Sequence, residues 1–540
     1  MLTNPILSGF HADPCICQRG DEFFMAVSSF EWFPAVPIYH SYDLKHWELY
    51  AHGITHSLDL RNLPSAKGVW APCLSYCPEE ELFYLVYGVM NSMNARFFDV
   101  DNYVITTKDV RDVWSAPSYI GSAGFDASLF HDEDGTKWVV SLEWESRVGY
   151  REPGAICLSQ YDPIRKKLTG YPVRIWDGGT ERGCIEGPHI YKRNGWYYLL
   201  CAEGGTGYGH SVTMGRSKQI EGPYESDPCN PILTSTPDFS ELHDSWFLKT
   251  HRYNPDSKLQ KSGHGSIVQT SLGEVYMVHH CARPFLPELR CPLGRETGIQ
   301  KMQWTTDDWL RLSGGGNIAK EYVESSALPD KPFPILPALE DFSLPLRLDW
   351  YAPRIPYQTF VTQKNNSLYL RGQESLSSLH QVSLLAKKLR STQAQCQVKL
   401  TFSPEVYQHS AGVVVYYDNM NYVFFRKYYS QTCQGSALGI LHVRNGEKTS
   451  PPEVRIPFSD ASVWLKIEIQ DRVIQFYHAS NKTNDTPSSY NLLPMTFDMT
   501  EFSDEFCKYG EFTGAFLGLA TIDGMFHEKE AQFQNFSYQW

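Results

Sequence analysis

Five segments in the first 280 residues each carry one polar or aromatic side chain at the start of a short strand-like run. They are HADPCI with Asp13, VWAPCL with Trp70, GFDASL with Asp126, CIEGPHI with Glu186 and SGHGSI with His264. A second apolar run, such as DEFFMAV or WYYLLCAE, follows each segment. The five residues recur at intervals of roughly 55 to 80 positions, and a strand-rich repeat of this length predicts a ring of β-sheet blades. We therefore expect an all-β chain that begins with a five-bladed β-propeller.

Equivalent positions in such a ring face a common axis, so these five side chains should meet in one pocket. Two carboxyl groups hydrolyse a glycosidic bond when one of them is protonated and the other is ionised. A third carboxylate supplies negative charge that raises the pKa of the protonated one. The pattern alone fits two classes equally well: a hydrolase, and a non-catalytic propeller that binds sugar or acts as a scaffold.

The composition of the chain excludes some classes of binding partner. The net charge of −13 at pH 7 argues against nucleic acid and anionic membrane, because both require basic surfaces. Aromatic residues make up 14% of the sequence, which suits packed sheets and also sugar-binding surfaces. The N-terminal sequence shows no signal-peptide pattern, and apolar runs such as GVVVYY are far too short to span a membrane. These features predict a cytoplasmic protein.

The thirteen cysteines are odd in number and scattered along the chain. Their spacing does not resemble a disulfide framework. Cys15 with Cys17, and Cys73 with Cys77, would each supply half of a zinc ligand set, but the second half is missing in both cases. We therefore expect buried free thiols and no metal site at these cysteines.

A proline-rich segment divides the chain into two domains. Residues 1–322 carry the five-fold pattern and form the predicted catalytic propeller. Residues 323–340, which contain four prolines, disfavour both helix and central strand and are the predicted linker. Residues 341–540 contain about eight short alternating segments separated by turn signals. That pattern predicts an antiparallel, jelly-roll-like β-sandwich.

Taken together, the segments of both domains resemble glycoside hydrolase family 43, in its β-xylosidase branch with an appended β-sandwich. The similarity is carried, in family order, by NPILSGFHADP, SSFEWFPAVPIYHSYDLKHWE, GVWAPCLSY, GFDASLFHDEDG, CIEGPHIYK, GHGSIV, LGRET and TGAFLGLATID. It covers nearly the whole chain. The joint presence of these motifs favours hydrolysis over sugar binding alone.

The resemblance implies a role for each carboxyl group. Asp13 matches the general base that activates water, and Glu186 matches the general acid that protonates the leaving oxygen. Asp126 matches the residue that orients the substrate and keeps the pKa of the acid high. The family inverts anomeric configuration, which implies a base–acid separation of roughly 6.5–9.5 Å with room for a water molecule.

Binding residues are implied in the same way. Phe30 and Trp70 match aromatic walls of the sugar pocket, Arg295 matches an arginine near the substrate, and His264 matches a histidine beneath the pocket. Phe512 is the best match for an aromatic residue on a sandwich loop that reaches over the site, with a place in the sandwich core as its alternative. Trp32 and Phe33 fit either the pocket or a blade core. Cys15 departs from the small hydroxyl residue usual in the family.

These matches imply an exo-acting, inverting β-xylosidase of xylan degradation that releases xylose from the non-reducing ends of short β-1,4-xylo-oligosaccharides. An α-L-arabinofuranosidase, or an enzyme with both activities, is the alternative. A non-catalytic carbohydrate-binding propeller is the remote one. No cofactor is expected to be required, although some relatives hold a divalent cation such as calcium. Relatives often form dimers or tetramers, which implies a homo-oligomer.

Overall fold

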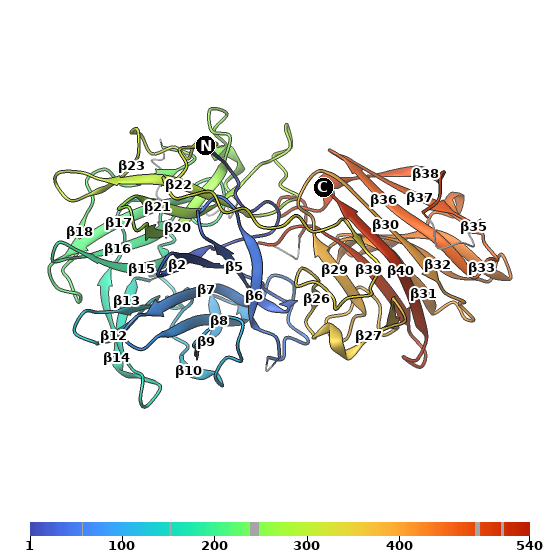
Figure 1. The fold of residues 1–540 in the computed structure, drawn as a ribbon, viewed down its shortest axis with the longest axis horizontal. Coiled ribbons are helices and arrows are strands. Elements are labelled where there is room, and N and C mark those ends of the chain that lie inside the picture. Colours follow the sequence, from blue (N-terminus) through green and yellow to red (C-terminus); the bar gives the residue numbers. More distant parts are fainter. Residues whose placement is uncertain (57, 151–153, 238–247, 481–485, 509–511) are drawn as a thin grey trace.

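The computed structural model describes residues 1–56, 58–150, 154–237, 248–480, 486–508 and 512–540. Two β-rich domains lie side by side, with the N-terminal and C-terminal parts of the chain in separate halves of the molecule (Figure 1). The described helices are short 3-10 turns: η1 (Thr250–Arg252), η2 (Tyr357–Thr359), η3 (Pro452–Val454) and η4 (Met499–Glu501). Within the described ranges, no helix has the length and apolar character needed to cross a membrane.

The N-terminal domain is a ring of five antiparallel sheets, as predicted. Blade 1 contains β2 (Cys15–Arg19), β3 (Glu22–Ala26), β5 (Ala35–Ser41) and β6 (Glu48–Ile54). Blade 2 contains β7 (Gly68–Cys77), β8 (Leu82–Asn94), β9 (Phe97–Thr107) and β10 (Ser118–Gly121). Blade 3 contains β11 (Ser128–His131), β12 (Lys137–Leu142), β13 (Ile156–Asp162) and β14 (Lys167–Trp176).

Blades 4 and 5 complete the ring. Blade 4 contains β15 (Glu186–Arg193), β16 (Trp196–Glu203), β17 (Ser211–Ser217) and β18 (Glu225–Ser226), with β19 (Leu233–Thr234) paired to β17. Blade 5 contains β20 (Gln260–Gln269), β21 (Val275–Ala282), β22 (Glu296–Trp304) and β23 (Leu310–Leu312). Each of the five recurring residues lies at or near the start of the first strand of its blade, or within it.

The N-terminus closes the ring. β1 (Leu2–Thr3) pairs with β24 (Tyr322–Val323), the last strand before the linker. The side chain of Asn4 donates to Ile299 O and Lys320 O and accepts from Ile299 N, over 2.7 to 2.9 Å. Apolar side chains of the first residues pack into one core with blades 1 and 5. Residues from the two ends of the propeller are thereby held next to each other.

Local irregularities mark the starts of the first strands. Asp13, Asp126 and His264 have positive φ angles of 54°, 55° and 51°, a conformation that costs energy for residues other than glycine. The strand register shifts just after Trp70 and again just after Glu186. Bulges of this kind re-aim a side chain relative to a regular strand. All five recurring side chains thus depart from the simple alternation of the blade.

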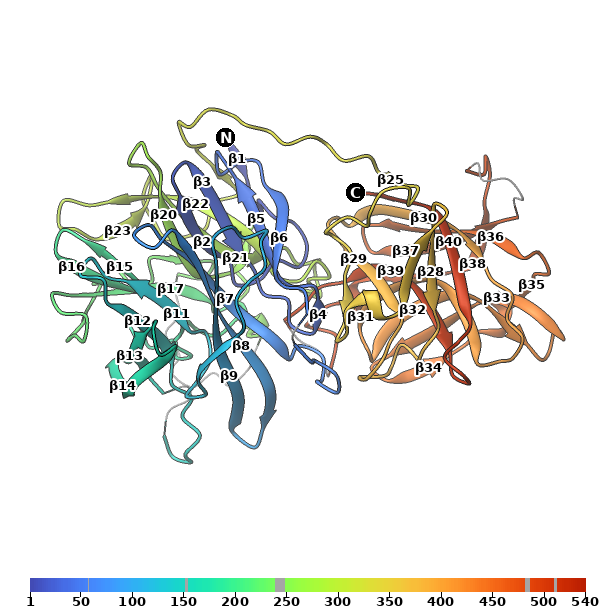
Figure 2. The ribbon, with the colours of Figure 1, turned by 60° about the horizontal axis from the view of Figure 1, so that its bottom comes forward.

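Residues 324–338 contain no strand or helix and run from the propeller to the sandwich (Figure 2). They lie within the predicted linker. The sandwich begins where β25 (Leu339–Glu340) pairs with β40 (Glu530–Gln539).

Two antiparallel sheets form the sandwich. The first orders β27 (Val361–Lys364), β28 (Ser367–Arg371), β40, β30 (Gln393–Thr401), β36 (Ser462–Gln470), β37 (Val473–Ala479) and β38 (Asn491–Asp498). The second orders β29 (Leu384–Lys388), β39 (Phe516–Asp523), β31 (His409–Asp418), β32 (Asn421–Ser430), β33 (Gly435–Arg444) and β34 (Glu447–Thr449), with β35 (Ile456–Pro457) on β33. Buried apolar side chains from both sheets share one core. The prediction of a β-sandwich is therefore confirmed.

A strand pair joins the two domains. β4 (Trp32–Phe33) of the propeller pairs with β26 (Ala352–Pro353) of the sandwich. The ring of Trp32 stacks on Phe516 of β39, with centroids 3.7 Å apart. Phe33 packs in the core between blades 1 and 2. Trp32 thus belongs to the domain interface and Phe33 to a blade core. The sequence alone did not decide between these places and the sugar pocket.

Candidate active site

Asp13 is the most strongly anchored of the three predicted acids. Its Oδ2 accepts a hydrogen bond from Ser28 Oγ (2.6 Å), and its Oδ1 accepts one from Arg295 Nη1 (3.0 Å). Nδ1 of His280 and Nδ1 of His264 lie 3.4 and 3.9 Å from the same Oδ1. Burial alone would raise the pKa of Asp13, but Arg295 and the two imidazoles outweigh it and hold that pKa well below its usual range. Asp13 is therefore an ionised carboxylate.

Glu186 and Asp126 form a pair of carboxyl groups in the same buried region. The backbone N–H of Gly187 donates to Asp126 Oδ2 over 3.0 Å, so the residue after Glu186 contacts Asp126 directly. Burial, and then the negative charge of Asp13, raise the pKa of Glu186 to about 8. Burial, followed by the charges of Glu186 and Asp13, also raises the pKa of Asp126. Because their ionisations oppose each other, the pair keeps at least one proton at neutral pH.

Glu186 is well placed to hold and donate that proton. Its Oε1 is buried and has no hydrogen-bond partner among the described residues. A buried polar atom of this kind is costly unless a ligand or water satisfies it. The positive charges of Arg295 and Lys249 oppose the rise in its pKa but do not cancel it. Repulsion between Glu186 and Asp126 raises the pKa of Asp126, so Asp126 lies close enough to Glu186 for the tuning role that the resemblance implies.

Four aromatic rings enclose the region next to the acids. Phe30 stacks on Phe512 with centroids 6.1 Å apart, and Trp70 meets Phe512 edge-on at 5.6 Å. Phe125 also packs edge-on against Trp70, with centroids 5.6 Å apart. Phe512 therefore lies with the propeller aromatics at the site, although it belongs to the sandwich half of the sequence. Apolar ring faces and edges of this type suit the C–H face of a sugar.

Arg295 joins the base to the sandwich loop. Its Nε and Nη2 donate to the backbone oxygen of Phe512 over 3.2 and 3.1 Å, while Nη1 donates to Asp13. A second anchor lies close by, where Lys261 Nζ donates to Glu505 Oε1 over 2.7 Å. Both cations are almost fully buried. The sandwich thus contributes to the site through fixed polar contacts as well as through a ring.

His264 lies beneath the acids, against Gly187. A Cβ added at Gly187 would lie 2.9 Å from Cε1 of His264, so only glycine allows this close approach. Burial lowers the pKa of His264, and the imidazole is neutral. In this position the ring supports the backbone that carries Glu186.

All eight predicted site residues meet in this one region: Asp13, Phe30, Trp70, Asp126, Glu186, His264, Arg295 and Phe512. Seven of them are buried, and Glu186 is half-buried. Sequence reasoning missed four further contributors, namely Ser28, Phe125, Lys249 and His280. Ser28 lies inside the SSFEWFP motif, and Phe125 directly precedes Asp126. His280 lies opposite Gly263 in the strand pairing of blade 5, which a register argument would have found. Lys249 lies outside every repeat, and we see no sequence signal for it.

Three acidic residues of the sandwich domain, Glu340, Asp341 and Asp523, could supply oxygen ligands to a cation, but each has other partners. Glu340 accepts from Trp350 Nε1 (3.0 Å) and pairs with Lys387 Nζ (2.6 Å). Asp523 accepts backbone N–H groups of its own turn, including that of Met525 over 2.9 Å. Asp341 accepts from Ser343. These donors already satisfy the carboxylates, so the three residues do not fit a shared calcium site.

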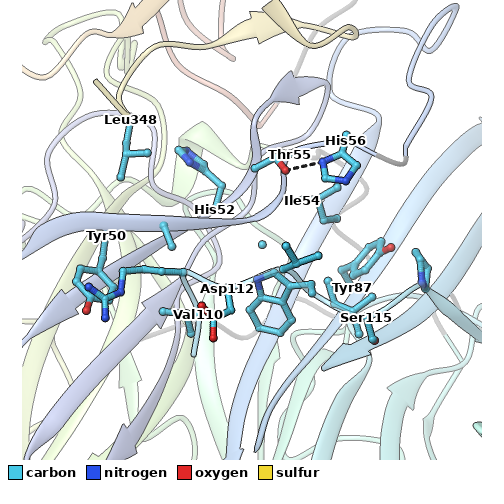
Figure 3. Close-up of a pocket in the computed structure, with 17 residues that line it drawn as sticks. Tyr50, His52, Ile54, Thr55, His56, Tyr87, Val110, Asp112, Ser115 and Leu348 are labelled. Atoms are coloured by element: carbon cyan, nitrogen blue, oxygen red, sulfur yellow. Dashed lines mark hydrogen bonds between the residues drawn. The ribbon is translucent and has the colours of Figure 1, made fainter. Parts of the chain in front are cut away.

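A separate cavity lies at the outer side of blades 1 and 2 (Figure 3). Its volume is about 420 Å³, and its lining includes Tyr50, His52, Tyr87, Trp114 and Leu348. None of the three acids lines it. This cavity is therefore distinct from the site built around Asp13 and Glu186.

Comparisons with known proteins match both domains. The model of "Glycosyl hydrolases family 43" matches residues 2–310, and that of the "Beta xylosidase C-terminal Concanavalin A-like domain" matches residues 340–539. A "Beta-xylosidase" of Bacillus subtilis is 36% identical over 100% of this chain and 99% of its own length. A "Xylosidase/arabinosidase 43B" of Humicola insolens is 38% identical over 100% and 97%, respectively. The crystal structure of a xylan β-1,4-xylosidase from Bacillus halodurans superimposes with a TM-score of 0.94 at 39% identity and covers both chains fully.

Proposed function

This chain belongs to glycosyl hydrolase family 43, and we propose that it is an exo-acting β-xylosidase that releases xylose from the non-reducing ends of short β-1,4-xylo-oligosaccharides. One arrangement carries the proposal: Arg295 contacts Asp13 and lowers its pKa, whereas burial and the charge of Asp13 raise the pKa of Glu186 beside it. An ionised base beside a protonated acid is what acid–base hydrolysis of a glycoside requires. The full-length similarity to proteins named xylosidases supports the choice of sugar.

The proposed reaction proceeds with inversion. Glu186 donates its proton to the glycosidic oxygen as the bond from the anomeric carbon to that oxygen breaks. Asp13 takes a proton from a water molecule, whose oxygen attacks the anomeric carbon from the opposite face. Asp13 ends protonated and Glu186 ends ionised, and exchange with solvent restores both. Asp126, held by the Gly187 N–H, is proposed to orient a sugar hydroxyl.

The aromatic enclosure supports exo-cleavage. Phe512 and Trp70 pack edge-on beside the acids, and we propose that they bound a site for one terminal sugar ring rather than for an unbroken polymer. A site that is closed by a residue of a second domain accepts the end of a short chain. The proposed product is therefore a single xylose per turnover.

Comparison of two aryl glycosides tests the choice of substrate. We expect kcat/KM for p-nitrophenyl β-D-xylopyranoside to exceed that for the α-L-arabinofuranoside by about tenfold or more. Small differences in the contacts that a pocket makes with two similar substrates are worth about 1 to 3 kcal/mol, which corresponds to at least about tenfold. Release of xylose from xylobiose should accompany this preference. A higher kcat/KM for the arabinofuranoside would establish the alternative activity, which the name of the Humicola relative also suggests. Binding without turnover of either glycoside would indicate a carbohydrate-binding propeller.

Replacement of Phe512 by alanine should weaken substrate binding more than it slows the chemical step. Loss of one aromatic contact of about 1 to 1.5 kcal/mol predicts a rise in KM of about tenfold, with a smaller change in kcat. The matched control is Phe526→Ala, since Phe526 is an exposed phenylalanine of the same domain. Steady-state kinetics on xylobiose measures both variants. An unchanged KM in Phe512→Ala would return this residue to a packing role.

We further propose that the reaction needs no cofactor, since acid, base and orienting group all come from the chain.

A cytoplasmic location is supported by the thirteen cysteines, all of which lie in the described ranges and are free thiols. Assembly into a dimer or tetramer remains part of the proposal. Cell fractionation tests the proposed location, and sedimentation analysis tests the proposed oligomeric state.

A further inference from the structure

The five inner strands carry a second ring of side chains, two or three positions after the five recurring residues. Each member of this ring is almost fully buried. The members are Cys15, Cys73, Ser128, His189 and Ser266, one from each blade. The propeller therefore stacks a layer of thiols, hydroxyls and one imidazole next to its layer of acids.

Three members of this second ring converge closely. Sγ of Cys15, Sγ of Cys73 and a ring nitrogen of His189 all lie within 4.8 Å of one another, although they come from blades 1, 2 and 4. The hydroxyl of Ser266 lies beside them, with Oγ 4.0 Å from Sγ of Cys15. Tetrahedral zinc binds thiolate at about 2.3 Å and imidazole at about 2.0 Å, so its ligand atoms lie about 3.5 to 3.8 Å apart. Small side-chain rotations would close this difference.

The protonation chemistry of the cluster suits a metal. Burial lowers the pKa of His189 to about 3, so its imidazole is neutral and has a free lone pair. A cation bound between the two sulfur atoms would displace both thiol protons, as thiolate ligation requires. Two thiolates and one divalent cation have no net charge, which keeps the cost of burial low.

We propose that Cys15, Cys73 and His189 form a binding site for one thiophilic divalent cation, zinc in the cell, that ties three blades together beneath the catalytic layer. Binding releases the two thiol protons to solvent and forms two metal–sulfur bonds and one metal–nitrogen bond. The fourth position stays open for water or the Ser266 hydroxyl. Soft thiolate ligands select zinc or cadmium over calcium and magnesium.

The sequence pairs Cys15 with Cys17 and Cys73 with Cys77, and neither pair forms this site. Side chains two or four positions apart on a strand point to the same face of the sheet. Cys17 and Cys77 therefore lie further along the strands that carry Cys15 and Cys73, away from the cluster. Cys15 and Cys73 meet only because β2, which begins at Cys15, packs against β7, which contains Cys73. All four cysteines are free, as the sequence predicts, and three are buried while Cys17 is half-buried. The proposal differs from the sequence-based expectation only in placing a metal at Cys15 and Cys73.

Metal content of the purified full-length protein gives the first test. After expression in zinc-supplemented medium and dialysis, we expect about one zinc per chain by mass spectrometry. Cys15→Ser and Cys73→Ser should each lose it. The matched controls are Cys396→Ser, which removes a buried thiol of the sandwich, and Cys229→Ser, which removes an exposed one. Both controls should retain the zinc.

Cadmium titration of metal-free protein gives a test that needs no cysteine variant. Thiolate-to-cadmium charge-transfer absorption should saturate at one equivalent. His189→Gln, which keeps both thiols, should weaken cadmium binding by at least about tenfold. Absence of this absorption, zinc retained in both cysteine variants, zinc lost in a control, or a Cys15–Cys73 disulfide in the purified protein would each overturn the proposal.

Discussion

Glu186→Gln should hydrolyse xylobiose about 10²- to 10⁴-fold more slowly than the wild-type enzyme, because it lacks the proton that the leaving oxygen requires. The amide has the same shape as the carboxylic acid, so binding should change little. The loss should be much smaller for p-nitrophenyl xyloside, since nitrophenolate leaves readily without protonation. Comparison of kcat for these two substrates isolates the role of an acid from a general loss of structure.

The pH profile gives an independent signature of the same residue. Glu186 is active while protonated, and burial with the charge of Asp13 raises its pKa to about 8. Wild-type activity on xylobiose should therefore persist below that pH and fall as the pH rises through it. In Glu186→Gln this basic limb should disappear.

An exposed glutamate of the same blade gives the control for this substitution. Glu225→Gln removes a carboxylate from β18 that pairs with Arg216 at the surface, and it should leave both substrates unaffected. Equal losses on xylobiose and on the aryl xyloside in Glu186→Gln would show that Glu186 is not the acid.

Asp13→Asn should lose about 10²- to 10⁴-fold in kcat on both substrates alike, because activation of water is needed whatever the leaving group is. Asparagine tolerates the positive φ of 54° at this position and keeps the size of the side chain. The neutral amide cannot accept the proton of the attacking water. Kinetics on xylobiose and on the aryl xyloside should thus separate this variant clearly from Glu186→Gln.

Chemical rescue tests the base and the stereochemistry together. Asp13→Gly suits the left-handed backbone and opens space for a small anion. Azide should restore turnover of the aryl xyloside and give α-xylosyl azide, since attack from the face opposite the leaving group inverts the β-xyloside. The wild-type enzyme should release α-xylose first, as followed by proton NMR. Early β-xylose, or full activity of Asp13→Asn, would contradict the assigned mechanism.

Local sequence was enough to predict the blades and the three acids. Alternating apolar runs and turn residues define strands over a few positions, and the repeat indicates a ring. Asp13, Asp126 and Glu186 occupy equivalent places in that repeat, so their convergence follows from the ring itself. The β-sandwich followed from the same short-range signals.

Contacts between distant segments could not be predicted in this way. Ser28 and His280 reach Asp13 from other strands, and Arg295 reaches it across 282 positions of sequence. Phe512 joins the site because the two domains pack together: β4 pairs with β26, the ring of Trp32 stacks on the sandwich, and Arg295 holds the backbone oxygen of Phe512. The resemblance pointed to Arg295 and Phe512, but no periodicity indicated their contact.

The five recurring residues by themselves therefore determined which groups meet at the axis of the ring. Tertiary structure alone decided which of these groups is charged. Burial raises the pKa of every carboxyl group here, and only the cation of Arg295 with two imidazoles reverses this effect at Asp13. Desolvation and long-range charge depend on positions in space, whereas strand and repeat patterns depend on neighbours in the chain. For the same reason, Cys15 and Cys73 looked like two separate half-sites in sequence and meet at His189 only in the folded ring.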